Sequence, residues 1–375
     1  MFTKINELCS QIESFDLNTT SEKLFIDAMI ENYSFQLENQ PYIKYLYDKS
    51  NIDINSIKSI DDIFNIPPLF VETMKYHGFC SVKPEDIHMT LKSSGTGGQK
   101  TQSFFDKDST TRLETLSYNT FKKMGYTSSK PVHYFVMAYD IRKASDVGTS
   151  WSDNFVMSLA PSKSTHWLIE WDEKKKTYYF DEKKWARKFI ELSSDAPVRL
   201  LGFPAYMYKL LEEVKKLSTS VSVHEDSFIV AGGGWKNHLG KSMTLNEFSN
   251  YIESTIKLPS QNIGDTYGMA EHGVPYCSCP YGHYHIPIYS RLIVRDPLTM
   301  KIQPTYKEGL LQLFTPYNTA QPNLSVLSKD VVTIGENCPC GIDGLYIKSI
   351  SRGGLKKHKG CSIAAQEILN KQKEA

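Results

Sequence analysis

The sequence predicts an α/β protein with a mostly parallel sheet, flanking helices and a small antiparallel β region. Between residues 104 and 250, short apolar segments rich in β-branched and aromatic residues alternate with segments of helical periodicity. This alternation is typical of a parallel sheet whose strands are joined by helices. From residue 285 onward the apolar segments are shorter and are separated by Pro, Gly and Asn, which indicates antiparallel strands.

The individual elements follow from local patterns. Residues 1–50 have mainly helical spacing, with a helix start expected at Ser21 and an interruption at Pro41. Residues 60–70 predict a short helix that is ended by a Pro-Pro pair. Further helices are expected over residues 106–124, 183–192 and 205–217. Strands are expected over residues 88–93, 132–140, 198–204 and 227–234 and, in the antiparallel region, within IPIYSRLIV, GLLQLFT, VVTIG and LYIKSI.

Composition excludes several classes of protein. The 375 residues carry a formal net charge of +1, which argues against a surface that binds the phosphate backbone of nucleic acids. The sequence contains no run of about 18 apolar residues, so it predicts no membrane span. The N-terminal segment does not resemble a secretory signal. The seven cysteines are odd in number and spread along a long chain, so we expect free thiols in a cytoplasmic protein rather than a disulfide framework.

A glycine-rich segment follows the expected strand at residues 88–93. It reads SSGTGGQK and supplies Ser93, Ser94, Gly95, Thr96, Gly97, Gly98 and Lys100. Glycines let backbone amides approach phosphate oxygens, hydroxyls add donors, and a lysine adds positive charge. The spacing is not that of a Walker A loop, because Gln99 precedes the lysine. The segment therefore predicts a phosphate-binding loop, with a flexible surface turn as the alternative.

This segment resembles the phosphate-binding loop of the adenylate-forming superfamily, which includes acyl-CoA synthetases, luciferases and phenylacetate-CoA ligases. Two more segments resemble the family's motifs in the expected order. AGGGWK contains the glycines that would line the acyl-adenylate, and DTYGMAEHG contains a tyrosine for adenine and a glutamate for Mg²⁺. Ala270 stands where the family usually has threonine. The implied nucleotide-binding residues are Gly232, Gly233, Gly234, Asp265, Thr266, Tyr267 and Gly268, with Glu271 as the magnesium ligand.

Two residues further along extend the resemblance. Asp330 falls where the family places an aspartate on the ribose hydroxyls, and a carboxylate is a strong acceptor for two hydroxyl donors. Arg352 resembles the hinge arginine that follows. A solvated turn aspartate and a surface arginine are the alternatives. The resemblance implies the fold of the N-terminal domain of adenylate-forming enzymes, with a truncated C-terminal domain.

The C-terminal segment suggests where an activated acyl group would go. We expect an adenylation core over residues 1–345, with its β region at about 285–345, and a basic tail over residues 346–375. Cys361 in KKHKGCS has cations beside it, which would stabilise a nucleophilic thiolate. The tail resembles that of the bacterial acyl-protein synthetases of the LuxE type. That family implies ATP- and Mg²⁺-dependent conversion of a long-chain fatty acid to acyl-AMP, transfer to Cys361, and delivery to a partner acyl reductase.

The chemistry gives Lys100, Glu271 and Cys361 the catalytic roles. A carboxylate is a poor electrophile, and coupling it to the α-phosphate of ATP gives a mixed anhydride with AMP as the leaving group. Lys100 and a cation held by Glu271 would neutralise phosphate charge. An acyl-CoA or amide ligase of the phenylacetate-CoA ligase type, and a non-catalytic binding protein with the same fold, are the alternatives.

Two Cys-Xaa-Cys pairs with nearby histidines predict a structural zinc site. The candidate ligands are Cys277, Cys279, His285, Cys338 and Cys340. Thiolate and imidazole ligands suit tetrahedral Zn²⁺. The two pairs are about 60 residues apart, so the fold would have to bring them together. Ordinary buried thiols are the alternative.

Overall fold

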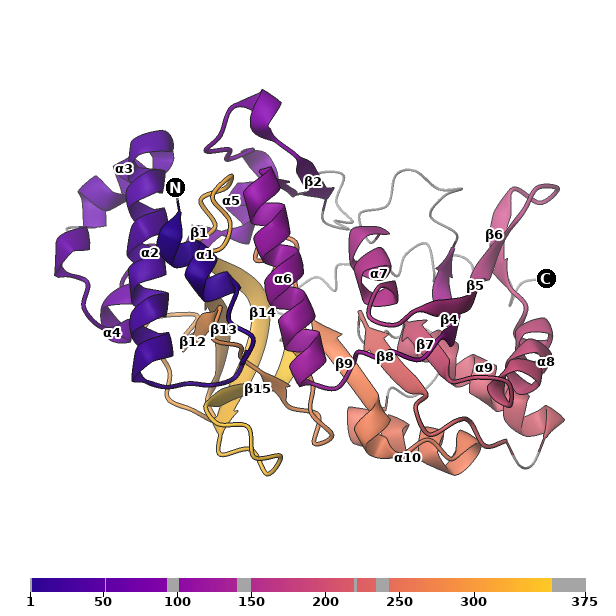
Figure 1. The fold of residues 1–375 in the computed structure, drawn as a ribbon. Coiled ribbons are helices and arrows are strands. Elements are labelled where there is room, and N and C mark those ends of the chain that lie inside the picture. Colours follow the sequence, from indigo (N-terminus) through magenta and orange to yellow (C-terminus); the bar gives the residue numbers. More distant parts are fainter. Residues whose placement is uncertain are drawn as a thin grey trace. The chain divides into compact units, whose positions relative to one another are not determined.

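The structure is a computed structural model that describes residues 2–50, 52–92, 101–139, 150–218, 221–233 and 243–352. The chain forms two compact units (Figure 1). The described part of the first unit falls within residues 2–123, 268–276 and 283–352, and that of the second within residues 124–267 and 277–282. Among these residues, no helix is both long enough and apolar enough to cross a membrane.

The second unit is built on a seven-stranded sheet in the order β10-β9-β8-β7-β4-β5-β6. Strands β4, β5, β7, β8 and β9 are mutually parallel, and β6 returns antiparallel to β5. The strands are β4 Val132–Tyr139, β5 Ser162–Asp172, β6 Thr177–Phe180, β7 Val198–Gly202, β8 Phe228–Gly232, β9 Ile263–Tyr267 and β10 Tyr276–Cys277. The helices are α7 Ser150–Met157, α8 Glu182–Ser193, α9 Pro204–Leu217 and α10 Leu245–Ile256.

One face of this sheet carries the apolar core of the second unit. Phe135 of β4 and Leu200 of β7 belong to a buried cluster with side chains of α8, α9 and α10. Phe189 of α8 meets Phe135 edge to face, with ring centroids 5.3 Å apart. Burying these side chains stabilises the unit and fixes the helices against the strands, because each large apolar side chain contributes about 1.5–3 kcal/mol when removed from water.

The first unit is built on a mainly antiparallel sheet in the order β11-β15-β14-β13-β12, with β1 parallel to β14. Its strands are β1 Leu69–Phe70, β11 Tyr284–His285, β12 Arg291–Arg295, β13 Glu308–Phe314, β14 Ser325–Glu336 and β15 Leu345–Arg352, and a separate hairpin pairs β2 Met89–Lys92 with β3 Gln102–Phe105. Its helices are α1 Thr3–Cys9, α2 Thr19–Asn39, α3 Pro41–Ser50, α4 Ile60–Ile63, α5 Val71–Tyr76 and α6 Lys107–Lys123.

Most elements expected from the sequence are confirmed within a few residues. The strands at β2, β4, β7 and β8 and the helices α4, α6, α8 and α9 lie where apolar periodicity places them. One prediction was wrong: α2 begins with Asn18 as its N-cap, and Ser21 is the third helical residue of a capping box. Both Asn18 and Ser21 can cap a helix, and the sequence alone favoured the residue nearer the apolar run. Strand β15 continues to Arg352, beyond residue 345.

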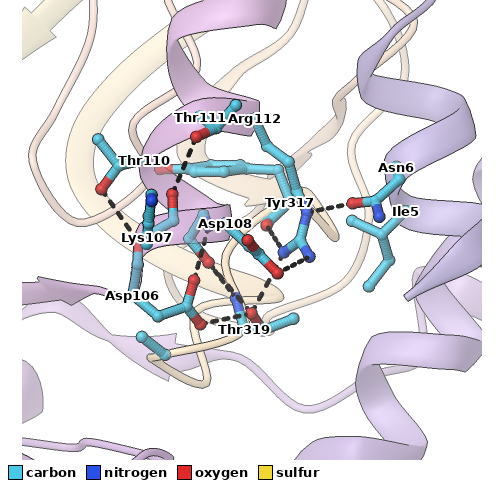
Figure 2. A network of polar contacts seen from close by, with 12 residues as sticks. Ile5, Asn6, Asp106, Lys107, Asp108, Thr110, Thr111, Arg112, Tyr317 and Thr319 are labelled. Atoms are coloured by element: carbon cyan, nitrogen blue, oxygen red, sulfur yellow. Dashed lines mark hydrogen bonds and ion pairs between the residues drawn. The ribbon is translucent and has the colours of Figure 1, made fainter. Parts of the chain in front are cut away.

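A buried arginine joins three segments of the first unit (Figure 2). Arg112 of α6 donates from Nε to Asn6 Oδ1 at 2.7 Å and from Nη1 to the Tyr317 carbonyl at 3.0 Å. Its Nη1 also lies 3.2 Å from Thr319 Oγ1. Thr319 in turn donates to Asp106 Oδ2 at 2.8 Å. The arginine therefore fixes the buried connection between β13 and β14 against α1 and α6.

We expect Arg112→Leu to destabilise the protein by about 3 kcal/mol, because the buried carbonyl of Tyr317 would lose a charged donor. Denaturant unfolding of Arg112→Leu, compared with that of the control variant Lys107→Leu, measures the loss in free energy of unfolding. Lys107 is an exposed residue on the same helix, so its substitution is expected to change the free energy of unfolding by less than about 0.5 kcal/mol. Equal stability of both variants would contradict the structural role of Arg112.

Candidate functional site

The second unit has a topological switch point between β4 and β7. The chain passes from β4 to β5 on one side of β4, and later returns to β7 on its other side. In parallel sheets, a crevice for ligands forms at such a point, outside the carboxyl ends of the strands. Gly202 at the end of β7 has φ +111°, and a Cβ atom there would lie 3.1 Å from Met137 Cβ. Glycine thus permits the close approach of β7 and β4 at this end.

The predicted glycine stretch lies at the carboxyl end of the neighbouring strand, β8. Gly232 is its last residue, and Gly233 follows with φ +75°. A Cβ atom on Gly233 would lie 2.6 Å from Cε1 of Phe203, so a larger residue would clash as well as strain the backbone. Gly232 is the register partner of Thr266 on β9. The structure therefore brings two of the predicted nucleotide-binding segments, Gly232–Gly233 and Asp265–Tyr267, side by side.

Asp265 and Thr266 of β9 are held by local hydrogen bonds. The backbone N–H of Asp265 donates to Ser278 Oγ at 2.8 Å, and the Thr266 N–H donates to Asp265 Oδ1 at 2.8 Å. The Thr266 hydroxyl donates to the Ala231 carbonyl of β8 at 3.3 Å. Tyr267 ends the strand and is half-buried. These contacts fix the carboxyl end of β9 next to that of β8.

Glu271, the predicted magnesium ligand, is buried in the first unit with 5% of its surface exposed. Burial raises the pKa of its carboxyl group, and a hydrogen bond from Thr101 and the charge of Lys75 lower that pKa in part. Asn323 donates from Nδ2 to the Glu271 carbonyl at 3.0 Å. Asn323 has 1% of its surface exposed, and its Oδ1 atom has no hydrogen-bond partner within the described part of the chain. Buried oxygens of this kind are suited to a hard cation.

Asp330 and Arg352 are register partners on β14 and β15 of the first unit. Asp330 is close enough to Glu271 for its charge to raise the pKa of that carboxyl group further. Next to it, Lys329 pairs with Glu72 at 2.6 Å, and Glu72 also pairs with Lys75 at 2.6 Å. Two predicted site residues distant in sequence are thus cross-strand neighbours. The side chain of Arg352 lies outside the described atoms.

Several predicted site residues lie outside the described residues. These are Ser93, Ser94, Gly95, Thr96, Gly97, Gly98, Lys100, Gly234 and Cys361. Strands β2 and β3, which flank the glycine-rich segment, pair in register from Met89–Phe105 to Lys92–Gln102. The segment therefore connects the two strands of a hairpin. Gly268, the remaining predicted residue, lies three residues before Glu271 in the first unit.

Cysteines and histidines near β11 and β15 lie close enough together to hold a metal ion. The ligand atoms of His285, Cys338 and Cys340 lie within 4.8 Å of one another, and Cys279 is the fourth member of this candidate group. Cys340 Sγ is 3.1 Å from His285 Nε2, and Cys338 Sγ is 3.1 Å from His283 Nδ1. Cys277 is buried but is not a member.

The donor set fits a zinc ion. Burial lowers the pKa of His285 to about 4, which leaves its imidazole in the neutral form that binds metals. Thiols and imidazole are the ligands of structural zinc sites. His283 stacks on Tyr346 with ring centroids 4.0 Å apart, so its ring is held in place beside Cys338.

A family model described as "Acyl-protein synthetase, LuxE" matches residues 4–370. The chain belongs to the LuxE acyl-protein synthetase family. It is therefore an enzyme of the ligase class. The match extends past β15 and includes Cys361, which agrees with the resemblance of the tail.

Two curated LuxE relatives carry the name long-chain-fatty-acid–luciferin-component ligase. The relative from Aliivibrio fischeri is 24% identical over 356 residues, which cover 93% of this chain and 89% of the relative. The relative from Vibrio harveyi is 21% identical over 311 residues, which cover 83% of this chain and 80% of the relative.

Solved structures show that this LuxE family member has the fold of adenylate-forming ligases. A crystal structure of 2-hydroxyisobutyryl-CoA ligase in complex with 2-HIB-AMP and CoA has a TM-score of 0.69 at 14% identity, covering 91% of this chain and 70% of that one. A structure of the same ligase in its postadenylation state has a TM-score of 0.68 at 13% identity, and the match covers 91% of this chain and 69% of that one. The predicted fold class is confirmed.

Thr101 and Asn323 are candidate site residues that the sequence pattern did not indicate. Thr101 follows the glycine-rich segment directly, and its position after a predicted phosphate loop is a signal that could have been used. Asn323 lies 52 residues from Glu271 and has no motif around it. Only the packing of the β13–β14 connection places it beside Glu271.

Proposed function

We propose that the chain activates a long-chain fatty acid with ATP as an acyl-AMP and transfers the acyl group to Cys361 as a thioester, for delivery to a partner acyl reductase. The observation that carries the proposal is the family match over residues 4–370, which includes Cys361, together with the fatty-acid substrate in the names of both curated relatives. The location is expected to be the cytoplasm, where thiols are kept reduced.

Residues of both units fit ATP and magnesium. The glycines at the end of β8 let the backbone approach a ligand closely, and Tyr267 at the end of β9 is an aromatic side chain suited to stack on adenine. Asp330 is a carboxylate for ribose hydroxyls. The carboxylate of Glu271 and the Asn323 Oδ1 oxygen fit Mg²⁺, which would neutralise phosphate charge.

Cys361 is the proposed acyl acceptor because of its chemical environment in the sequence. Lys356, Lys357, His358 and Lys359 precede it closely. Nearby cations favour the thiolate, which is the nucleophilic form of cysteine. In the transfer step the Cys361 sulfur bonds to the acyl carbon, the bond from that carbon to the phosphate oxygen breaks, and AMP leaves.

A fatty-acid-dependent exchange of labelled pyrophosphate into ATP tests the first step. We expect exchange with long-chain fatty acids, in the presence of Mg²⁺, and none without the acid. No exchange with any acid would favour a non-catalytic binding protein. Rapid formation of acyl-CoA on addition of coenzyme A, without an acyl-protein, would favour an acyl-CoA ligase.

We also propose that Cys279, His285, Cys338 and Cys340 bind a structural zinc ion, with His283 as the alternative to Cys279. The support is the gathering of these ligand atoms next to β11 and β15. Such an ion would hold the segment after β14 against β11 and would take no part in acyl transfer.

Metal analysis of the purified protein tests this site. We expect about one zinc ion per chain in the parent protein, and less than about one tenth of that in Cys340→Ser. A tetrahedral site loses most of its affinity for the metal when one thiolate ligand is removed. Cys80→Ser is the matched control, since Cys80 lies outside the cluster and its thiol donates to the Val82 carbonyl. Equal zinc in both variants, or none in the parent protein, would contradict the site.

A further inference from the structure

A chain of hydrogen bonds in the second unit joins a serine, two histidines and a carboxylate. His133 of β4 has 3% of its surface exposed. Its Nδ1 lies 2.7 Å from Ser164 Oγ, and its Nε2 lies 2.8 Å from Asp195 Oδ2. His166 Nε2 lies 2.8 Å from the same Ser164 oxygen. No sequence motif indicated this group.

Three of the four side chains belong to paired strands. In the parallel pairing of β4 and β5, His133 is the register partner of Ser164 and Phe135 is that of His166. The His166 ring packs against Phe135, with ring centroids 5.2 Å apart. Asp195 lies in the turn after α8, two residues beyond its last residue. The group lies at the amino ends of β4 and β5, whereas the predicted nucleotide-binding glycines lie at the carboxyl end of β8.

The direction of the hydrogen bonds follows from the charge of Asp195. Lys163 and His133 hold the pKa of its carboxyl group below the usual range, so it is ionised and only accepts. His133 Nε2 therefore donates to it. In neutral His133 the other nitrogen, Nδ1, can only accept, and the hydrogen must come from the Ser164 hydroxyl. The Nε2–H of His166 then donates to Ser164 Oγ.

This direction is the one that activates a nucleophile. A serine that donates to a histidine, which in turn donates to a carboxylate, loses its proton to the histidine as it attacks a carbonyl carbon. Ser164 itself is half-buried, at the start of a strand, and its neighbours Lys163 and Asp195 are exposed. The serine oxygen is thus held by the buried His133 and the half-buried His166, next to exposed residues.

We propose that Ser164 is an activated nucleophile that accepts acyl groups from carboxylic esters, independently of adenylation and of Cys361. The Oγ–C bond forms and the ester C–O bond breaks. The serine proton passes to His133 and leaves with the alcohol, and water then hydrolyses the acyl-serine. His133 is the general base, and Asp195 is a positioning residue that fixes its tautomer. His166 supplies a donor within 2.8 Å of the reacting oxygen.

A fluorophosphonate probe on the full-length protein tests this proposal. The probe forms an Oγ–P bond with an activated serine as fluoride leaves and the proton passes to the general base. We expect labelling at Ser164, located by peptide mass spectrometry, and its loss in Ser164→Ala. Ser162→Ala is the matched control, because Ser162 is an exposed serine on the same strand whose hydroxyl contacts Thr165. This control is expected to label as the parent protein does.

Asp195→Asn separates activation from a structural role. The asparagine amide would donate to His133 Nε2, which moves the ring hydrogen to Nδ1 and removes the acceptor for Ser164. We expect labelling about 100-fold slower, in the range of general-base effects. Asp195 is exposed and its ion pair with Lys163 is a surface pair, so the melting temperature and the pyrophosphate exchange are expected to stay unchanged. Labelling of Ser164 no faster than that of Ser162, or an unchanged rate in Asp195→Asn, would overturn the proposal.

Discussion

Replacing Cys361 with serine should abolish the acyl-protein while leaving fatty-acid-dependent pyrophosphate exchange intact. A serine hydroxyl beside the same cations stays protonated at neutral pH, whereas a thiol in that position forms a thiolate. Labelled fatty acid with ATP, followed by denaturing electrophoresis, measures the acyl-protein. The expected loss is more than about 100-fold, because the acceptor atom itself is removed.

Cys80→Ser serves as the control for this experiment. Cys80 is half-buried, and burial would hinder its reaction with an activated acyl group. We expect this variant to form the acyl-protein at the parental rate. A labelled band of parental intensity in Cys361→Ser would show that another residue accepts the acyl group.

Substitution of Glu271 with glutamine should lower the rate of acyl-AMP formation by about 100-fold, as expected when a charge-neutralising group is lost from a buried site. The amide keeps the size of the side chain but removes the negative charge that would hold Mg²⁺. The Mg²⁺ concentration for half-maximal pyrophosphate exchange is expected to rise along with the loss of rate. Glu308→Gln, at an exposed glutamate of β13, should leave both quantities unchanged.

Glu271 should also make the Mg²⁺ requirement of the protein depend on pH. Burial raises the pKa of Glu271, so its carboxyl group takes up a proton at a higher pH than an exposed glutamate does. Protonation competes with cation binding, so the parent protein should need more Mg²⁺ as the pH falls through this raised pKa, whereas Glu271→Gln should not. A parallel response of the two proteins would remove Glu271 from the magnesium site.

The parallel core could be predicted because buried strands have a strong local pattern. Segments such as Val132–Tyr139 are almost entirely apolar, and helices with one apolar face follow or precede them. Strand β5, Ser162–Asp172, did not stand out, since its first residues are polar and half-exposed at the edge of the core. Its pairing with β4 depends on packing, which no local pattern encodes.

Residues of the candidate site could be predicted only where they lie within a recognisable sequence motif. Glu271 and Gly232 lie in short segments that resemble family motifs, whereas the contact of Asn323 with Glu271 arises from the long-range path of the chain. That Cys279 rather than Cys277 belongs to the candidate metal group likewise depends on the folded positions of the thiols, which spacing alone does not determine. The hydrogen bond between His133 and Ser164 depends on the register in which β4 pairs with β5.

Peptide mass spectrometry after a single turnover with ATP and a fatty acid tests whether Cys361 accepts the acyl group. We expect the peptide containing Cys361 to gain the mass of the fatty acid less one water, and hydroxylamine at neutral pH to remove this mass, as expected for a thioester. Acyl-AMP formation without any gain of mass on that peptide, or the same gain on a different residue, would show that Cys361 is not the acceptor.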